Sequence, residues 1–560
     1  MTNYQFTGGT ICAPATIPGT GAISIIRVSG KESLAIADKV IDTKGVPIAE
    51  TEGYRLRYGT VFEADGSVLD NVIVSVFRAP HSYTGENSVE ISCHASRFIV
   101  NKILELLVNA GARIAAPGEF TRRAFVNGKM DLAQAEAVAD VIASQSAASH
   151  RVAMNQLKGG FSSELKVLRE KLLTMTSLLE LELDFSEEDV EFASRKELGQ
   201  LVDDSLTHIG RLTASFSRGN AIKNGVPVAI VGATNTGKST LLNALLGEER
   251  AIVSDIAGTT RDTIEETLNI DGILFRFIDT AGIRETDETI EKIGIDRTFK
   301  KLGEAAVVLG MTDLSRGEAA VLEDADFILS KVNEMGGVKN VGLAIDGAET
   351  GGASLAETGG APLAGTDGAS RSKTVGTTPA ETGGASRHGH GDGQERIVVI
   401  LVNKCDVADN FYRDDNGTGY GSGNDLGKNK AKIGDNKNVN HNNNIVSLIE
   451  NKYNSCKVIA ISAKTGKGLS TLTKTLGEIG SEITGSTDET LVTNVRHYEA
   501  LVRAASALER VRAGLHIATL PPDLIAQDLR EALYHLGEIV GEITTDETLG
   551  NIFRNFCVGK

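Results

Sequence analysis

A phosphate-binding loop constrains the fold of this chain more than any other feature. An apolar run at 226–231 leads directly into Gly-Ala-Thr-Asn-Thr-Gly-Lys-Ser at 232–239, and a helix-forming stretch follows at 240–246. The glycines let successive backbone N–H groups point into one concavity, Lys238 adds a cation, and the Ser239 hydroxyl can ligate Mg²⁺. The positive end of the following helix faces the same phosphates. We therefore expect an α/β nucleotide-binding domain in which six residues contact the nucleotide: Asn235, Thr236, Gly237, Lys238, Ser239 and Thr240.

The next two segments have the type and order that a GTPase requires. The stretch 258–262 can supply the hydroxyl of a switch threonine, Thr260, to Mg²⁺. The apolar run 273–278 predicts a strand that ends in Asp279-Thr280-Ala281-Gly282. Asp279 would hold the metal through water, and the Gly282 N–H would contact the γ-phosphate. We therefore expect these four residues to line the nucleotide site.

A third pair of segments predicts selectivity for guanine. The buried strand expected at 397–402 ends in Asn403-Lys404-Cys405-Asp406. A carboxylate such as Asp406 can accept hydrogen bonds from N1–H and the exocyclic amine of guanine, which adenine cannot offer together. Ser462-Ala463-Lys464, after an expected strand at 457–461, would complete the pocket for the base.

Composition limits the class of protein. The chain has 560 residues, of which 41% are hydrophobic, so three or four domains with their own cores are expected. No apolar run is long enough to span a membrane, and the N-terminus lacks the features of a signal peptide. Five scattered cysteines without metal-like spacing favour a reducing, cytoplasmic location. The net charge of -17 argues against a broadly basic nucleic-acid face but permits a local one.

The first 128 residues mix short strands with helices and contain no phosphate loop. Strands are expected at 22–28 and 88–92, and each carries one charged residue, Arg27 and Glu90 respectively. These charges indicate either a functional pair or simply a solvent-exposed sheet face, and the pattern leaves both interpretations open.

Long helices follow from Lys129. Apolar residues then step by three and four along one helix face, at Leu165, Leu168, Leu172, Met175 and Leu179. A helical pattern returns from about 495 to the end of the chain. Two helical blocks on either side of a nucleotide domain suggest one bundle into which that domain is inserted, although two unrelated helical segments are the alternative. The predicted domains are 1–128, a helical domain from 129–222 and 488–560, and a nucleotide-binding domain at 223–487.

Two segments of the nucleotide-binding domain are typical of disordered insertions. Residues 336–396 are rich in Gly, Ala and Thr and repeat Ala-Glu-Thr-Gly-Gly-Ala, and residues 407–444 are rich in Asn, Gly, Asp and Lys. Neither composition can bury a core.

Taken together, the motifs resemble those of the MnmE (TrmE) family of tRNA-modifying GTPases, over nearly all of the chain except the two insertions. The resemblance rests on Pro-Gly-Thr-Gly-Ala-Ile at 18–23, Ser-Tyr-Thr-Gly-Glu at 82–86, the segments 117–125 and 127–132, the GTPase motifs in order, and Phe-Cys-Val-Gly-Lys at 556–560. The chain departs from the family at His94-Ala95-Ser96, where His-Gly-Gly is usual.

The resemblance implies an N-terminal tetrahydrofolate-binding and dimerising domain, a discontinuous helical domain and an inserted G domain. It also implies a homodimer that forms a heterotetramer with the flavoprotein MnmG. That complex would modify the wobble uridine of certain tRNAs at C5, adding an aminomethyl or carboxymethylaminomethyl group with a one-carbon unit from 5,10-methylenetetrahydrofolate or 5-formyltetrahydrofolate. By position, four residues would contact the folate: Arg27, Glu90, Lys129 and Lys560.

The hydrolytic mechanism requires a substitute for the usual glutamine. Ile283 follows the Asp-x-x-Gly motif, and its side chain cannot orient a water molecule. The resemblance points instead to Glu291 and to a potassium ion that replaces an arginine finger and neutralises charge between the β- and γ-phosphates. Considered alone, Glu291 is better explained as an ordinary solvated glutamate on a helix. The implied K⁺ ligands are Asn235, Ser254, Ile256 and Thr259.

Two alternatives remain open. Cys557, fourth from the end of the chain, is either a free buried thiol or, as the resemblance suggests, part of the modification centre. The whole chain could also be a GTP-switched RNA-binding assembly factor, for example for ribosomes, without modification chemistry. Such a factor would share the GTPase motifs but would not need Arg27, Glu90, Lys129 or the Cys-x-Gly-Lys terminus.

Overall fold

Two compact units make up the computed structural model of the chain. It describes residues 8–184, 194–248, 265–278, 303–335, 337–339, 396–406, 445–453, 456–485, 489–517, 521–554, 556 and 559. The first unit comprises Met1–Val226, Thr267–Arg276 and Gly480–Lys560, and the second comprises Pro227–Glu266 and Phe277–Ile479.

The N-terminal part of the first unit is an α+β domain around a seven-stranded sheet, ordered β3-β4-β5-β6-β2-β1-β7. Buried and exposed residues alternate along the long strands, so one face carries the core and helices α1 and α2 pack on that face. The strands are β1 (Ile11–Pro14), β2 (Ile23–Ser29), β3 (Ile41–Asp42), β4 (Arg55–Phe62), β5 (Val68–Phe77), β6 (Ser88–His94) and β7 (Arg113–Ile114), and the helices are α1 (Ser33–Val40) and α2 (Arg97–Asn109).

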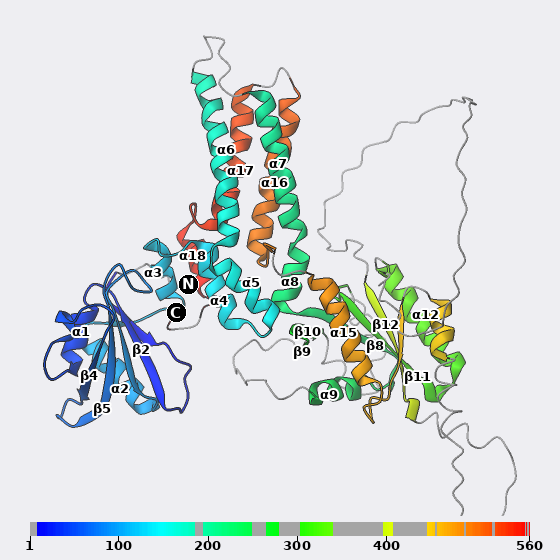
Figure 1. Ribbon diagram of the computed structural model, residues 1–560, viewed down its shortest axis with the longest axis horizontal. Coiled ribbons are helices and arrows are strands. Elements are labelled where there is room, and N and C mark those ends of the chain that lie inside the picture. The colour runs from blue at the N-terminus through cyan, green and yellow to red at the C-terminus, as the bar shows by residue number, and fades with distance from the viewer. Residues whose placement is uncertain are drawn as a thin grey trace, which may run out of the picture. The chain divides into compact units, whose positions relative to one another are not determined.

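A helical domain built from two stretches that are far apart in the sequence completes the first unit. Figure 1 shows α6, α7, α16 and α17 side by side. The apolar helix face predicted from the sequence is confirmed, since Leu165, Leu168, Leu172 and Leu179 are buried in one core with residues of α16 and α17. Because the core is shared, the two helical blocks form one discontinuous bundle and are not two unrelated segments. The helices are α4 (Leu132–Ala143), α5 (Ala147–Leu157), α6 (Gly160–Asp184), α7 (Arg195–Ala214), α8 (Phe216–Asn224), α16 (Val495–Leu515), α17 (Pro522–Val540) and α18 (Asp546–Arg554). The preceding helix α3 (Glu119–Val126) packs on the N-terminal domain, since its Phe120 is buried with Ile11 and Ala13.

The nucleotide-binding domain contains a six-stranded sheet in the order β13-β12-β11-β8-β10-β9. Strands β8, β11, β12 and β13 pair in parallel, so their carboxyl ends lie at one edge. This is the arrangement predicted from the phosphate loop, and ligands of such sheets bind at that edge. The elements are β8 (Val226–Gly232), β9 (Glu266–Ile270), β10 (Ile273–Ile278), β11 (Val307–Asp313), β12 (Ile397–Asn403) and β13 (Lys457–Ala460), with α9 (Lys238–Glu248), α12 (Glu318–Glu334) and α15 (Leu469–Thr484).

The boundaries of the first predicted insertion differ from the expectation. Val338 forms a parallel bridge with Arg396, so residues at both ends of the expected insertion 336–396 belong to the folded domain. Residues 340–395 and 407–444 lie outside the described residues. Within the described part, no helix is long and apolar enough to cross a membrane, and four cysteines are free: Cys12, Cys93, Cys405 and Cys456.

Candidate functional site

The phosphate loop joins the carboxyl end of β8 to the first turn of α9. Gly237 has φ +96°, and a Cβ at this position would lie 2.5 Å from Nδ2 of Asn403. Asn235 also has a positive φ of 60°. The backbone therefore forms a tight turn that a side chain at Gly237 would disrupt, as a cradle for phosphates requires.

Lys238 lies across this loop. Its ammonium group donates hydrogen bonds to the carbonyl oxygens of Gly232, at 2.9 Å, and Ala233, at 2.8 Å. Burial lowers the pKa of Lys238 from its ordinary value. The side chain is thus held by the loop itself, at the position from which a lysine contacts the outer phosphates of a nucleotide.

Asn403 joins the phosphate loop to the expected base pocket. Its Nδ2 donates to the Thr236 carbonyl at 2.7 Å, and its Oδ1 accepts from the Ala463 N–H at 3.0 Å. Ser462 donates from Oγ to Oδ1 of Asp406 at 2.7 Å. The structure therefore brings together the residues expected from three separate segments, while Lys464 lies exposed at the rim.

One residue of this site was not identified from the sequence. Asp313 ends β11, and its Oδ2 lies 2.7 Å from Nζ of Lys404. Burial acts to raise the pKa of Asp313, but hydrogen bonds from Lys404 and Ser315 outweigh it and lower the pKa. Asp313 thereby orients Lys404 beside the base pocket. Asp313 ends a fully buried strand, as Asn403 also does. A charged residue at such a position was the sequence signal that could have identified it.

Several expected site residues lie outside the described residues, so the structure does not place them. They are Ser254, Ile256, Thr259, Thr260, Asp279, Thr280, Ala281, Gly282, Glu291, Cys557 and Lys560.

Arg27 and Glu90 form a second site on the sheet of the N-terminal domain. The two residues are register partners on β2 and β6, and Nε and Nη2 of Arg27 donate to Oε1 of Glu90 at 3.0 and 2.7 Å. Their side chains are only 16% and 25% exposed, so the pair is not an ordinary solvated sheet face. The ring centroids of Tyr83 and Phe120 lie 5.2 and 5.7 Å, respectively, from the guanidinium carbon of Arg27. This is a half-buried, aromatic-walled ion pair.

The C-terminus of the chain closes this site. Arg27 Nη1 donates to the carbonyl oxygen of Gly559 at 3.4 Å. Gly559 has φ +97°, and a Cβ there would overlap the carbonyl oxygen of Pro14. Gly118 packs in the same way against Phe553 and Phe556. Gly559 is therefore packed against β1 of the N-terminal sheet, beside the Arg27–Glu90 pair.

Lys129 belongs to the same neighbourhood through the loop that precedes β6. Its Nζ donates to the carbonyl of Pro80 at 3.0 Å, and its side chain lies against Gly85. Glu86, in the same loop, is held by the buried Arg123 at 3.0 Å. Lys129 is thus attached to the loop that carries Tyr83, which connects three of the four residues expected to contact folate.

Two family models and several known proteins match this chain. A family model described as "MnmE helical domain" matches residues 132–557, and one described as "GTP-binding protein TrmE N-terminus" matches residues 10–129. The tRNA modification GTPase MnmE of Parabacteroides distasonis is 44% identical over 98% of this chain and 100% of its own length. The proteins of the same name from Bacteroides thetaiotaomicron and Porphyromonas gingivalis are 44% and 42% identical, over 98% and 100% of this chain and 99% of their own lengths.

The matches cover both candidate sites and the helical domain that connects them, so the GTPase motifs and the N-terminal site are parts of one family architecture. The chain belongs to the MnmE (TrmE) family of tRNA modification GTPases.

Proposed function

We propose that this chain, together with the flavoprotein MnmG, modifies C5 of the wobble uridine of certain tRNAs, using a one-carbon unit from tetrahydrofolate. The contact between Arg27 and Gly559 carries the proposal, because Gly559 belongs to the Phe-Cys-Val-Gly-Lys segment at 556–560 that the family resemblance assigns to the modification centre. The product would be an aminomethyl or carboxymethylaminomethyl uridine.

The Arg27–Glu90 pair fits the head group of a reduced folate, either 5,10-methylenetetrahydrofolate or 5-formyltetrahydrofolate. In the described part of the chain both hydrogen bonds from Arg27 to Glu90 end on Oε1, so Oε2 can accept hydrogen bonds from the N–H groups of a pterin. Tyr83 is partly exposed and can contact a flat heterocycle, while the fully buried Phe120 packs against Arg27. Lys129 and Lys560 would contact the polar remainder of the ligand. Cys557 would lie at the modification centre.

GTP would be held by the phosphate loop, and its guanine by Asp406 with Ser462, Ala463 and Lys464. Ser239, Thr260 and Asp279 would hold Mg²⁺. Asn235 with Ser254, Ile256 and Thr259 would hold K⁺, which supplies positive charge beside the β- and γ-phosphates when bound. Glu291 would orient the attacking water. The domain boundaries that accompany this assignment are 1–128, 129–222 with 488–560, and 223–487.

A homodimer through the N-terminal domain is part of the proposal. The sheet face opposite α1 and α2 exposes large apolar side chains on the adjacent strands β4 and β5: Leu56 is 66% exposed, Tyr58 65% and Ile73 48%. Tyr58 is the register partner of Ile73, so these two side chains adjoin, and Ile23 on β2, beyond β6, is 66% exposed. Apolar surface of this kind is typical of a protein interface. The Arg27–Glu90 pair lies on the same face.

Binding of 5-formyltetrahydrofolate to the full-length protein tests this function. We expect saturable binding to the wild type and at least tenfold weaker binding to Arg27→Ala, because the substitution removes the partner of Glu90. Modification of a tRNA in the presence of MnmG should fall in parallel. Wild-type protein that hydrolyses GTP but binds no reduced folate would favour the RNA-binding assembly factor instead.

A further inference from the structure

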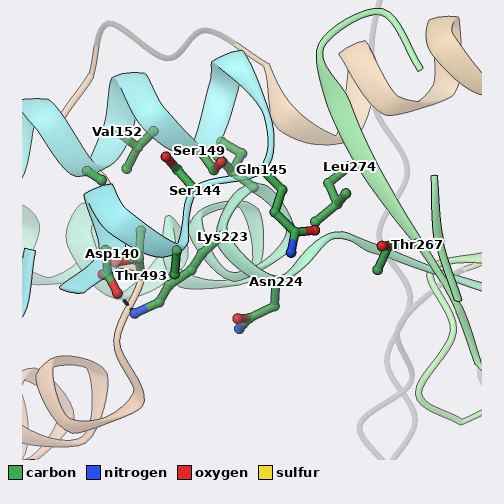
Figure 2. Close-up of a pocket in the computed structure, with 13 residues that line it drawn as sticks. Asp140, Ser144, Gln145, Ser149, Val152, Lys223, Asn224, Thr267, Leu274 and Thr493 are labelled. Carbon is green, nitrogen blue, oxygen red and sulfur yellow. Dashed lines mark hydrogen bonds and ion pairs between the residues drawn. The ribbon is translucent and has the colours of Figure 1, made fainter. Parts of the chain in front are cut away.

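Two concavities adjoin at Ser144 and Gln145, in the loop between α4 and α5, and their charges differ. The first, shown in Figure 2, is a pocket of about 260 Å³. The dashed line in Figure 2 joins Nζ of Lys223 to Oδ2 of Asp140, and this distance is 2.8 Å. The lysine of this pocket is therefore neutralised by a neighbouring carboxylate.

The second concavity is an open groove of about 910 Å³ along the exposed side of α5, and none of the described residues that line it is acidic. His150, Arg151 and Lys158 are its basic members, and all three are exposed. Although the chain contains 74 acidic residues among 560, residues 141–163 contain none. The groove is thus a local basic surface on a protein with a net charge of -17.

The spacing along α5 places these groups on one face. Arg151, Asn155 and Lys158 follow one another at intervals of four and three residues, so their side chains are neighbours on the helix surface. Arg151 and Lys158 are about 10 Å apart along the axis, at about 1.5 Å per residue. Two cations at this separation, with an amide between them, can contact different charged groups of an extended polyanion.

Neutral donors complete the groove. Ser144, Gln145, Asn155 and Asn269 line it, and Nδ2 of Asn269 donates to the Gln145 carbonyl at 3.0 Å, which holds the β9–β10 hairpin against the loop. Lysine, arginine and neutral amides are the side chains that bind phosphate and sugar oxygens. Met154 and Ala147 are its apolar members, and no Phe, Tyr or Trp is among the lining residues that the structure describes. A protein partner would be expected to require an apolar, aromatic centre.

We propose that the α5 groove, lined by Arg151, Asn155 and Lys158, binds the sugar–phosphate backbone of the tRNA substrate. The proposal rests on the proposed function, since it assigns a surface to the RNA of that reaction. It also fits the path of the chain: α4 begins three residues after Lys129 and has 12 residues, so about 18 Å of helix leads from the second site to the groove. One RNA molecule can contact both places.

Titration of a fluorescent transcript of a tRNA with a wobble uridine against the full-length protein, alone and with MnmG, tests the proposal. We expect Arg151→Ala and Lys158→Ala each to weaken binding roughly fivefold, the effect of one charge-assisted contact. Each should also reduce the slope of log K against log salt concentration by about one, which marks a lost phosphate contact. Lys158→Arg should restore wild-type binding, because it keeps the charge.

The matched controls are Lys166→Ala and Lys171→Ala, which remove exposed cations from α6 and should leave both affinity and slope unchanged. Thermal unfolding midpoints equal to that of the wild type confirm that the groove variants fold. Wild-type affinity and slope in both groove variants would overturn the assignment, and loss of MnmG binding in the same variants would assign the groove to an acidic protein surface instead. Absence of tRNA binding by the wild type, alone and with MnmG, would overturn the proposed function as well.

Discussion

Replacing Glu136 with glutamine should destabilise the helical domain by about 3 kcal/mol. Glu136, on α4, is 8% exposed and accepts hydrogen bonds from Arg496 at 3.0 and 3.1 Å, while Nε2 of His497 lies 2.7 Å away. Arg496 also donates to the carbonyls of Glu538, at 2.7 Å, and Ile539, at 3.1 Å, near the end of α17. Three helices therefore meet at one buried carboxylate.

The magnitude follows from the pKa of this carboxyl. Burial acts to raise the pKa of Glu136, but His497 and Arg496 outweigh it through their charges and hydrogen bonds and lower the pKa from 4.5 to about 2. At about 1.4 kcal/mol per pKa unit this corresponds to about 3 kcal/mol. Loss of one partner from a buried ion pair costs a similar amount, about 3–5 kcal/mol. The expected fall in the melting temperature of the helical domain is roughly 6–12 °C.

The pH dependence provides an independent check. A carboxyl whose pKa is lower in the folded state stabilises the fold above its unfolded pKa, and this contribution is lost as pH falls from 4.5 towards about 2. The difference in stability between wild type and Glu136→Gln should therefore be full at neutral pH and shrink below pH 4.5.

Hydrogen exchange followed by mass spectrometry measures the local stability of wild type and Glu136→Gln, on peptides from α4 and the start of α16. Glu180→Gln is the matched control, because Glu180 pairs with Arg530 between α6 and α17 but is 40% exposed and should contribute no more than about 1 kcal/mol. Equal protection of α4 in wild type and Glu136→Gln, or a difference that does not change with pH, would refute the reasoning.

Three shorter predictions concern the two sites. GTP hydrolysis should be several-fold faster in K⁺ than in Na⁺, because Ile283 cannot orient water and a cation near Asn235 would compensate; equal rates in both salts would contradict this. Asp406→Asn should weaken GTP binding at least tenfold and relax the choice of base. Asp313→Asn should weaken GTP binding less than tenfold, because Asp313 acts only through Lys404. Unchanged GTP affinity of either variant in a titration would remove that residue from the site. Gly559→Ala should abolish folate-dependent modification with GTP hydrolysis retained, since a Cβ at φ +97° overlaps Pro14, and normal modification would show that the terminus need not dock there.

Periodicity and local motifs were enough to predict the main elements. Leu165 and Leu172 identified the bundle by helical spacing, and the strands that carry Arg27 and Glu90 were predicted to within two residues at each end. The phosphate loop and the guanine motif are local in sequence, so their order alone predicted the nucleotide site. Each of these signals depends on residues a few positions apart.

Pairings between distant residues could not be predicted in the same way. Glu136 lies in an alanine-rich helix and looks like a solvated glutamate, but its partner Arg496 is 360 residues away. The contact of Arg27 with Gly559 joins positions 532 apart. Such pairs are set by how helices and sheets pack, and a single sequence contains no periodic signal for them. Asp313 differs in that its position at the end of a buried strand is a local signal, but its contact with Lys404 depends on the register of β11 and β12.

The topology of β12 gives the first insertion a predictable effect. The phosphate loop leaves the carboxyl end of β8, which pairs in parallel with β11, and β11 pairs in parallel with β12. Val338 and Arg396 form their bridge just before β12 begins, so the anchors lie at the edge of the sheet opposite the nucleotide. Lys339 N–H donates to the Arg396 carbonyl at 2.8 Å, which holds these two residues beside each other.

Replacement of residues 340–395 with a linker of about eight Gly and Ser residues should therefore leave GTP affinity and turnover within about twofold of the wild type. The same replacement of 407–444, which leaves the guanine motif at the nucleotide edge, should change turnover or dimerisation more. The matched pair of variants is compared by GTP titration, steady-state hydrolysis and sedimentation. If the first replacement abolished GTP binding in a folded protein while the second had no effect, the assignment of the two segments to opposite edges of the sheet would be wrong.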